Sequence, residues 1–153
     1  MTTPQQQIES DLKSAMKAGD KERLSTLRML LTEIKNERIR AGSEVDERTL
    51  VSLVRKGIKQ RHESAEQFRN AGREETAAKE EREAAILEEY LPKQADPAEI
   101  RRAVETLAAE QGLAGPQDLG KVMRPMIERF GTTADGATLQ RIAREVLTAR
   151  AAG

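Results

Sequence analysis

The chain has 153 residues and carries 26 basic and 26 acidic side chains, so its formal net charge is zero. This length fits one ordinary domain or two small ones, and the charge balance argues against a strongly basic nucleic-acid-binding protein. The absence of cysteine excludes disulfides, thiolate metal sites and cysteine nucleophiles, and three aromatic residues are too few for the base-stacking sheets of RNA-recognition domains.

Apolar residues recur at intervals of three and four along the chain, which is the period of an amphipathic α-helix. Asp20, Asp46 and Asp135 precede such runs and are typical helix caps, because their side-chain oxygens accept hydrogen bonds from free backbone N–H groups. The sequence predicts helices at about residues 4–18, 20–42, 46–72, 73–90, 97–112, 116–131 and from 135 onward. We expect Pro125 to kink or split the sixth helix, because proline lacks a backbone donor. The predicted fold class is therefore all-α.

Two prolines, Pro92 and Pro97, interrupt the helical pattern, since residues before proline avoid helical geometry. This break predicts an N-terminal helical bundle of about four helices in residues 1–92 and a C-terminal three-helix domain in residues 93–153. The second part contains 61 residues (153 − 92), which is a size at which three-helix modules fold.

The first residues have neither the basic cluster nor the apolar core of a secretory signal. No apolar run approaches the roughly 18 residues of a membrane span. We therefore expect a cytosolic protein with no membrane partner. The single histidine and the lack of cysteine also lead us to expect no metal and no cofactor.

The charges separate by helix although their total is zero. Five basic residues and no acidic one lie between Arg48 and Arg61, whereas seven acidic and three basic residues lie between Arg73 and Glu89. Two interpretations remain open. The cations could form a stripe suited to phosphates, or the third and fourth helices could pack antiparallel and neutralise each other across their seam.

Arg61 differs from the other cations because its helical angle places it near the middle of the apolar face. A buried guanidinium must be paired to be tolerated. We therefore predict a structural ion pair between Arg61 and a carboxylate of the fourth helix, with Glu80 and Glu83 as the candidates.

Several short segments, taken in order, resemble the YqeY-like family, which shares a helical domain with the tail of the B subunit of glutamyl/aspartyl-tRNA amidotransferase. They are residues 27–31 (LRMLL), 34–37 (IKNE), 58–61 (IKQR), 71–73 (AGR), Glu80 with Glu83, 90–92 (YLP), 118–123 (DLGKVM) and 134–136 (ADG). The resemblance covers essentially the whole chain. It implies an N-terminal helical bundle followed by a smaller three-helix domain similar to the amidotransferase tail.

The resemblance also implies a function. In the amidotransferase the related tail contacts tRNA, while the chemistry lies in other domains that nothing here matches. The family label of a carbon–nitrogen ligase with glutamine as amido-N-donor is then inherited from the shared domain, because fold does not carry function. We expect no catalytic residues and no enzymatic activity of the isolated chain.

The leading hypothesis is a non-catalytic accessory protein that binds tRNA or associates with tRNA-amidotransferase components. The candidate nucleic-acid-binding residues are Arg28, Lys35, Arg48, Arg55, Lys59, Lys121, Arg124, Arg141 and Arg144. The alternative is a helical protein–protein interaction module that does not bind RNA. A free-standing amidotransferase is the third interpretation, for which no nucleophile and base can be named.

Overall fold

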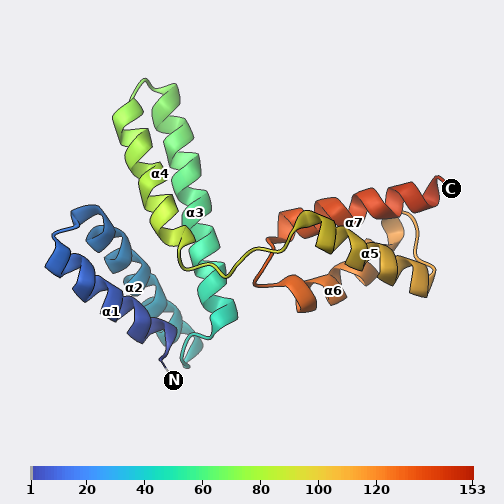
Figure 1. The fold of residues 1–153 in the computed structure, drawn as a ribbon, viewed down its shortest axis with the longest axis horizontal. Coiled ribbons are helices and arrows are strands. Elements are labelled where there is room, and N and C mark those ends of the chain that lie inside the picture. The colour runs from blue at the N-terminus through green and yellow to red at the C-terminus, as the bar shows by residue number, and fades with distance from the viewer. Residues whose placement is uncertain (1) are drawn as a thin grey trace. The chain divides into compact units, whose positions relative to one another are not determined.

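A computed structural model describes residues 2–153, and over these residues the chain is all-helical, without strands, which confirms the predicted fold class. The elements are α1 (Pro4–Ala18), α2 (Lys21–Ala41), α3 (Glu47–Asn70), α4 (Glu74–Glu88), α5 (Pro97–Gln111), the 3-10 helix η1 (Pro116–Asp118), α6 (Leu119–Phe130) and α7 (Gly136–Ala151) (Figure 1). The caps Asp20, Asp46 and Asp135 each accept a hydrogen bond from the backbone N–H three residues ahead. Among these helices, none is both long and apolar enough to cross a membrane.

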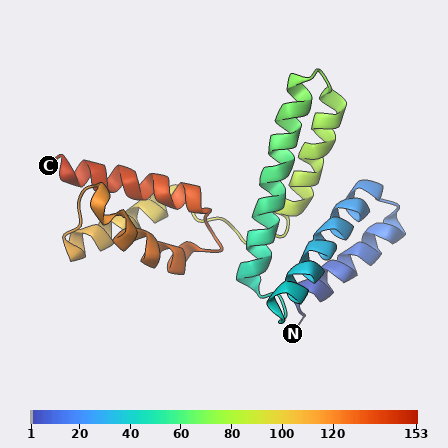
Figure 2. The ribbon, with the colours of Figure 1, turned by 180° about the vertical axis from the view of Figure 1, so that it is seen from behind.

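Contacts divide the chain into two compact units, one ending at Leu91 and the other beginning at Pro92. In the first unit, α1 pairs with α2 and α3 pairs with α4 to form two helical hairpins (Figures 1 and 2). The helices α3 and α4 lie side by side because small residues occupy their seam. Ala65, Ala77 and Ala84 are almost fully buried there, and a Cβ atom on Gly57 would lie only 3.0 Å from the Leu87 side chain.

One apolar cluster joins the two hairpins of the first unit. It draws on all four helices and on the loop between α2 and α3, and contains Ile8, Leu27, Leu30, Ile34, Val45, Leu50, Val54, Ile86 and Leu87. Leu27 and Ile34 are completely buried at the centre of α2. Because one side of α2 and one side of α3 are buried in this cluster, the other sides of these helices face solvent.

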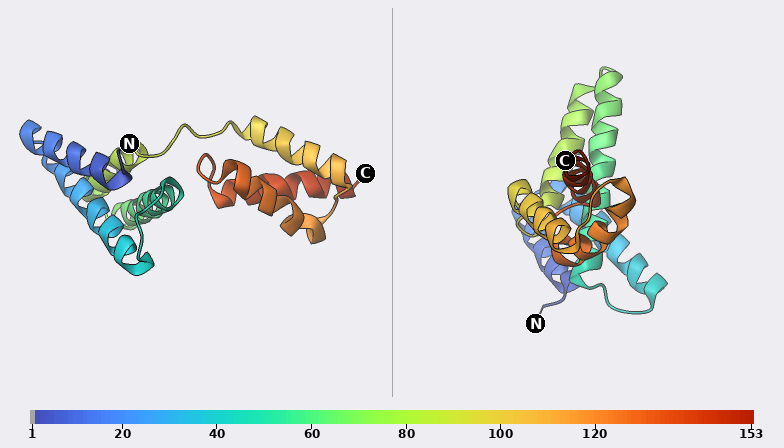
Figure 3. Two further views of the ribbon diagram at one scale, coloured as in Figure 1. Left: turned by 90° about the horizontal axis from the view of Figure 1, so that it is seen from below. Right: turned by 90° about the vertical axis from the view of Figure 1, so that its right-hand side faces the viewer.

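The second unit is built around α7, which packs against both α5 and α6 (Figure 3). Its core includes Ile100, Val104, Val122, Leu139 and Leu147, all of which are essentially inaccessible to solvent. The turn before α6 is tied to this core, since the Gly115 backbone N–H donates to the Leu147 carbonyl at 3.0 Å. These contacts hold α6 and α7 in place, with the polar side of each helix facing solvent.

The helix α6 runs without interruption from Leu119 to Phe130, with Pro125 inside it. Of the predicted kink or split at this proline, the split is therefore wrong, and the kink stays a prediction. The missing donor would have bonded the carbonyl of Lys121, an exposed position where water can take its place. Buried Val122 and Met126 hold the helix to the core on either side of the proline.

Candidate nucleic-acid interface

The two candidate cations of α2 lie on one side of that helix. Arg28 and Lys35 are seven residues, or about two turns, apart, and both are exposed. Neither forms an ion pair within residues 2–153. The neighbouring positions Leu27 and Ile34 face the core, so both cations are held at the edge of a helix that cannot rotate.

The cations of α3 are more strongly engaged by the protein itself. Arg48 and Arg55 both take part in interactions within the chain, and Arg55 is partly buried. The Lys59 ammonium is exposed and lies 4.0 Å from a Glu63 carboxylate oxygen. The stripe expected from helical spacing is therefore only partly available to an external anion.

The second unit carries four candidate cations in two pairs. On α6, Lys121 lies 3.5 Å from an Asp118 carboxylate oxygen, whereas Arg124 is exposed and forms no ion pair within the described residues. On α7, Arg141 lies 3.3 Å from a Glu145 oxygen, whereas Arg144 is exposed and has no such carboxylate. Among the candidate residues, each helix thus carries one cation with a carboxylate beside it and one that forms no ion pair within residues 2–153.

Arg61 lies between α3 and α4, where its side chain is only 9% exposed. Its Nε atom lies 3.3 Å from Glu83 Oε2, and its Nη1 group donates to the Gly57 carbonyl at 3.2 Å. The structure thus brings Arg61 against Glu83, one turn along α4 from the other candidate, Glu80. This pair is buried and serves the packing of the two helices.

Two further contacts link α2 to α4, and spacing in the sequence gave no sign of them. Arg23 forms a two-pronged ion pair with Glu89, at 2.9 and 3.2 Å. Its neighbour Glu22 accepts two hydrogen bonds from Arg82, which lower the pKa of the Glu22 carboxyl. Together they pair two arginines with carboxylates, although the Arg82 side chain remains 56% exposed.

Tyr90, the only tyrosine, is also engaged within the first unit. Its hydroxyl donates to Asp11 Oδ2 at 2.6 Å. Burial and this carboxylate both raise the pKa of Tyr90, which keeps the hydroxyl protonated and bonded. The tyrosine therefore anchors the end of the first unit to α1.

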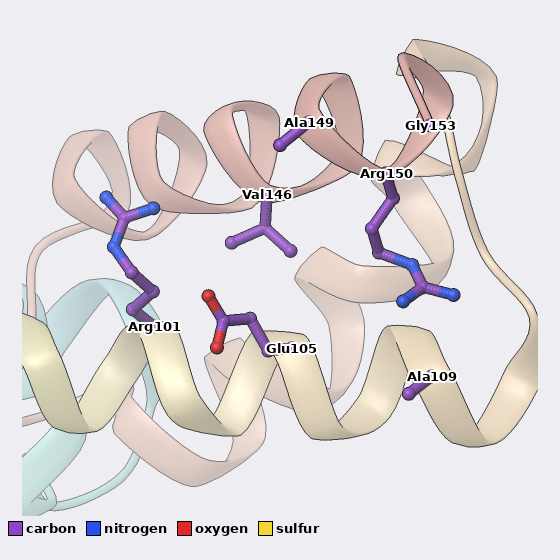
Figure 4. A pocket seen from close by; sticks show the side chains of 7 residues that line it. All are labelled: Arg101, Glu105, Ala109, Val146, Ala149, Arg150 and Gly153. Atoms are coloured by element: carbon purple, nitrogen blue, oxygen red, sulfur yellow. The ribbon is translucent and has the colours of Figure 1, made fainter.

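A cleft of about 600 Å³ lies between α5 and α7 (Figure 4). Arg101 and Arg150 stand at its two ends, with Glu105 between them. Arg101 is paired with Glu145, and the Arg150 Nε group donates to the Leu113 carbonyl at 2.7 Å. Because both arginines are bonded to the protein itself, we do not include the cleft in the interface.

Comparison with known proteins gives one family match, to Yqey-like protein, over residues 5–147. Relatives named altered inheritance of mitochondria protein 41, mitochondrial, occur in several fungi. The protein from Lachancea thermotolerans is 39% identical over 71% of this chain and 60% of its own length. The protein from Pyrenophora tritici-repentis is 33% identical over 94% of this chain and 80% of its own length. The protein from Vanderwaltozyma polyspora is 39% identical over 64% of this chain and 55% of its own length.

These relatives correct one expectation. Their names describe mitochondrial proteins, so the prediction of a cytosolic location is wrong. Its basis was the lack of a secretory signal and of a membrane-spanning run, and these observations do not outweigh the names of proteins that match up to 94% of the chain. The chain spans between 55% and 80% of the length of these three relatives.

Proposed function

Because the chain belongs to the Yqey-like protein family, we propose that it is a non-catalytic accessory protein that binds tRNA and works with tRNA-amidotransferase components. The observation that carries this proposal is that four of the nine candidate cations are exposed and form no ion pair within residues 2–153. They are Arg28 and Lys35 in the first unit and Arg124 and Arg144 in the second. A cation without an acidic neighbour releases a counterion from a nucleic acid when it meets a phosphate.

The proposal assigns recognition to the RNA backbone. The aromatic side chains are engaged within the protein: Arg73 lies over the Phe68 ring, Phe130 is buried, and Tyr90 is bonded to Asp11. Bases in single-stranded RNA are usually held by stacking on such rings. Contacts with phosphates and sugars remain as the source of affinity.

A titration of tRNA binding against salt tests the proposal. Four phosphate contacts, each contributing about 0.7–0.9 to the slope of log affinity against log salt concentration, give a slope of about −3. Filter retention or fluorescence anisotropy with the full chain measures this slope. If no tRNA is retained even at low salt, the proposed function is wrong.

A specific observation favours the second candidate function, a protein-interaction module. Ile39 is 80% exposed on α2, beside a shallow cleft lined by Lys35, Arg38, Gly42, Ser43 and Glu44. Apolar patches rimmed by polar residues mark protein interfaces, and Ile39 is the apolar side chain that such a patch would use here. Co-purification of amidotransferase components that survives nuclease treatment, together with no tRNA binding, would support this function instead of the first.

We further propose that the two units are independent domains, with four helices in residues 1–92 and three in residues 93–153. Each unit has its own apolar cluster, which supports separate folding. Residues 93–153 expressed alone are expected to retain a helical circular dichroism spectrum and to melt cooperatively. A broad, non-cooperative melt of this fragment would contradict the division.

A further inference from the structure

We propose that Met29 is a site of reversible sulfur oxidation and that its sulfoxide binds α2 more firmly to the buried Arg61. The Met29 side chain is 51% exposed on α2. Its sulfur nevertheless lies 3.7 Å from the Nη2 atom of Arg61, which reaches it from α3. An oxidant in solution can therefore reach a sulfur that touches a nearly buried cation.

Each guanidinium nitrogen of Arg61 has one acceptor among the described residues, and the acceptor of Nη2 is the weakest of the three. Its Nε–Glu83 contact is 3.3 Å long, and Nη1 has the Gly57 carbonyl. The third acceptor is the Met29 thioether, which accepts hydrogen bonds only weakly. A Cβ atom on Gly57 would lie 3.3 Å from Nη1, so the guanidinium is closely packed and has little room to turn toward other groups. A stronger acceptor at position 29 would therefore strengthen the hydrogen bond from Arg61 and stabilise the first unit.

Oxidation by a peroxide supplies such an acceptor. The sulfur gives two electrons to hydrogen peroxide, the O–O bond breaks, one oxygen is bound to sulfur and the other leaves as water. The product carries a polar S=O group in place of a weakly polar sulfur, and methionine sulfoxide reductases reverse the step. In apolar cores this change is disruptive. Beside Nη2 of the nearly buried Arg61, it replaces a weak sulfur acceptor with a charge-assisted hydrogen bond.

Met16 provides a matched comparison within the same unit. It is 52% exposed on α1, and its sulfur forms no hydrogen bond within the described residues. The two residues are exposed to a similar extent, but only the Met29 sulfur lies beside a cation. Oxidation of Met16 is therefore expected to give no gain in stability.

In the experiment, Met16→Leu and Met29→Leu variants of the whole 153-residue chain are treated with hydrogen peroxide. Peptide mass mapping locates the oxidised methionines, and circular dichroism measures thermal unfolding. Oxidised Met16→Leu protein is expected to melt about 4–8 °C above its reduced form, since that rise corresponds to one added hydrogen bond in a unit that ends at Leu91. Oxidised Met29→Leu protein is expected to show no rise. Comparing the two variants removes the contribution of methionines common to both.

A Met29→Gln variant tests the same contact without an oxidant, because its amide oxygen is a strong acceptor. It is expected to melt above Met29→Leu. The proposal is overturned if Met29 resists peroxide while Met16 reacts, if oxidation of Met29 leaves the melting temperature unchanged or lowers it, or if Met29→Gln is no more stable than Met29→Leu. None of these outcomes depends on tRNA binding.

Discussion

Replacing Glu83 with alanine is expected to destabilise the protein by about 3–5 kcal/mol, because the change leaves the buried Arg61 cation without its carboxylate. Both side chains are nearly inaccessible, at 9% and 12% exposure. The Gly57 carbonyl and the Met29 sulfur would remain as acceptors, but neither carries a charge. Chemical unfolding of the full chain, followed by helical circular dichroism, measures the loss.

Glu80→Ala is the matched control, since Glu80 precedes Glu83 by three residues on the same helix and does not contact Arg61. It is expected to change stability by less than about 0.5 kcal/mol, as surface substitutions usually do. Replacing the pair together, with Arg61→Met and Glu83→Leu, should recover most of the stability, because no uncompensated charge then remains. A loss below about 1 kcal/mol for Glu83→Ala would mean that the pair does not hold α3 and α4 together.

The burial of Arg61 follows from its helical angle, but the choice of its partner does not. Glu80 and Glu83 both lie on α4, and either could reach a neighbouring helix. The register between α3 and α4 decides between them, and it is set by close packing of Gly57 against Leu87. That packing depends on the shape of the seam, which periodicity alone does not describe.

The surface ion pairs show the same distinction, because pairs between residues close in the sequence can be predicted and pairs between distant residues cannot. Lys59 with Glu63 and Arg141 with Glu145 are four residues apart, so their proximity can be predicted from the helical repeat. Arg23 and Glu89 are separated by 66 residues and meet only because α2 packs on α4. Sequence spacing therefore predicts which cations pair with a carboxylate on their own helix, but it does not predict which cations pair with a carboxylate on another helix.

Helix boundaries were predictable for a physical reason. Asp20 and Asp46 cap helices through their own side chains, and Gly19 and Gly42 end helices with positive φ angles of 69° and 71°. These are local devices encoded by single residues. Pro125 is different, because α6 continues through it although proline lacks the backbone donor of a helix interior.

Replacing the four exposed candidate cations that form no ion pair within residues 2–153 with glutamine is expected to nearly abolish tRNA binding at physiological salt. The variant carries Arg28→Gln, Lys35→Gln, Arg124→Gln and Arg144→Gln. Removing four phosphate contacts lowers the salt slope by about 3, which corresponds to a loss of about 300-fold in affinity at about 0.15 M salt. Anisotropy titrations of the variant at several salt concentrations measure both quantities, and unchanged helical circular dichroism verifies folding.

The control variant removes the same amount of charge from cations that already have a carboxylate beside them: Arg40→Gln, Lys59→Gln, Lys121→Gln and Arg141→Gln. Their neighbouring acids already offset their charge, so few counterions are released from RNA when they approach it, and the salt slope should change by less than about 1. Equal loss in both variants would mean that tRNA responds to the net charge of the protein. A loss confined to the first variant would assign binding to the exposed faces of α2, α6 and α7.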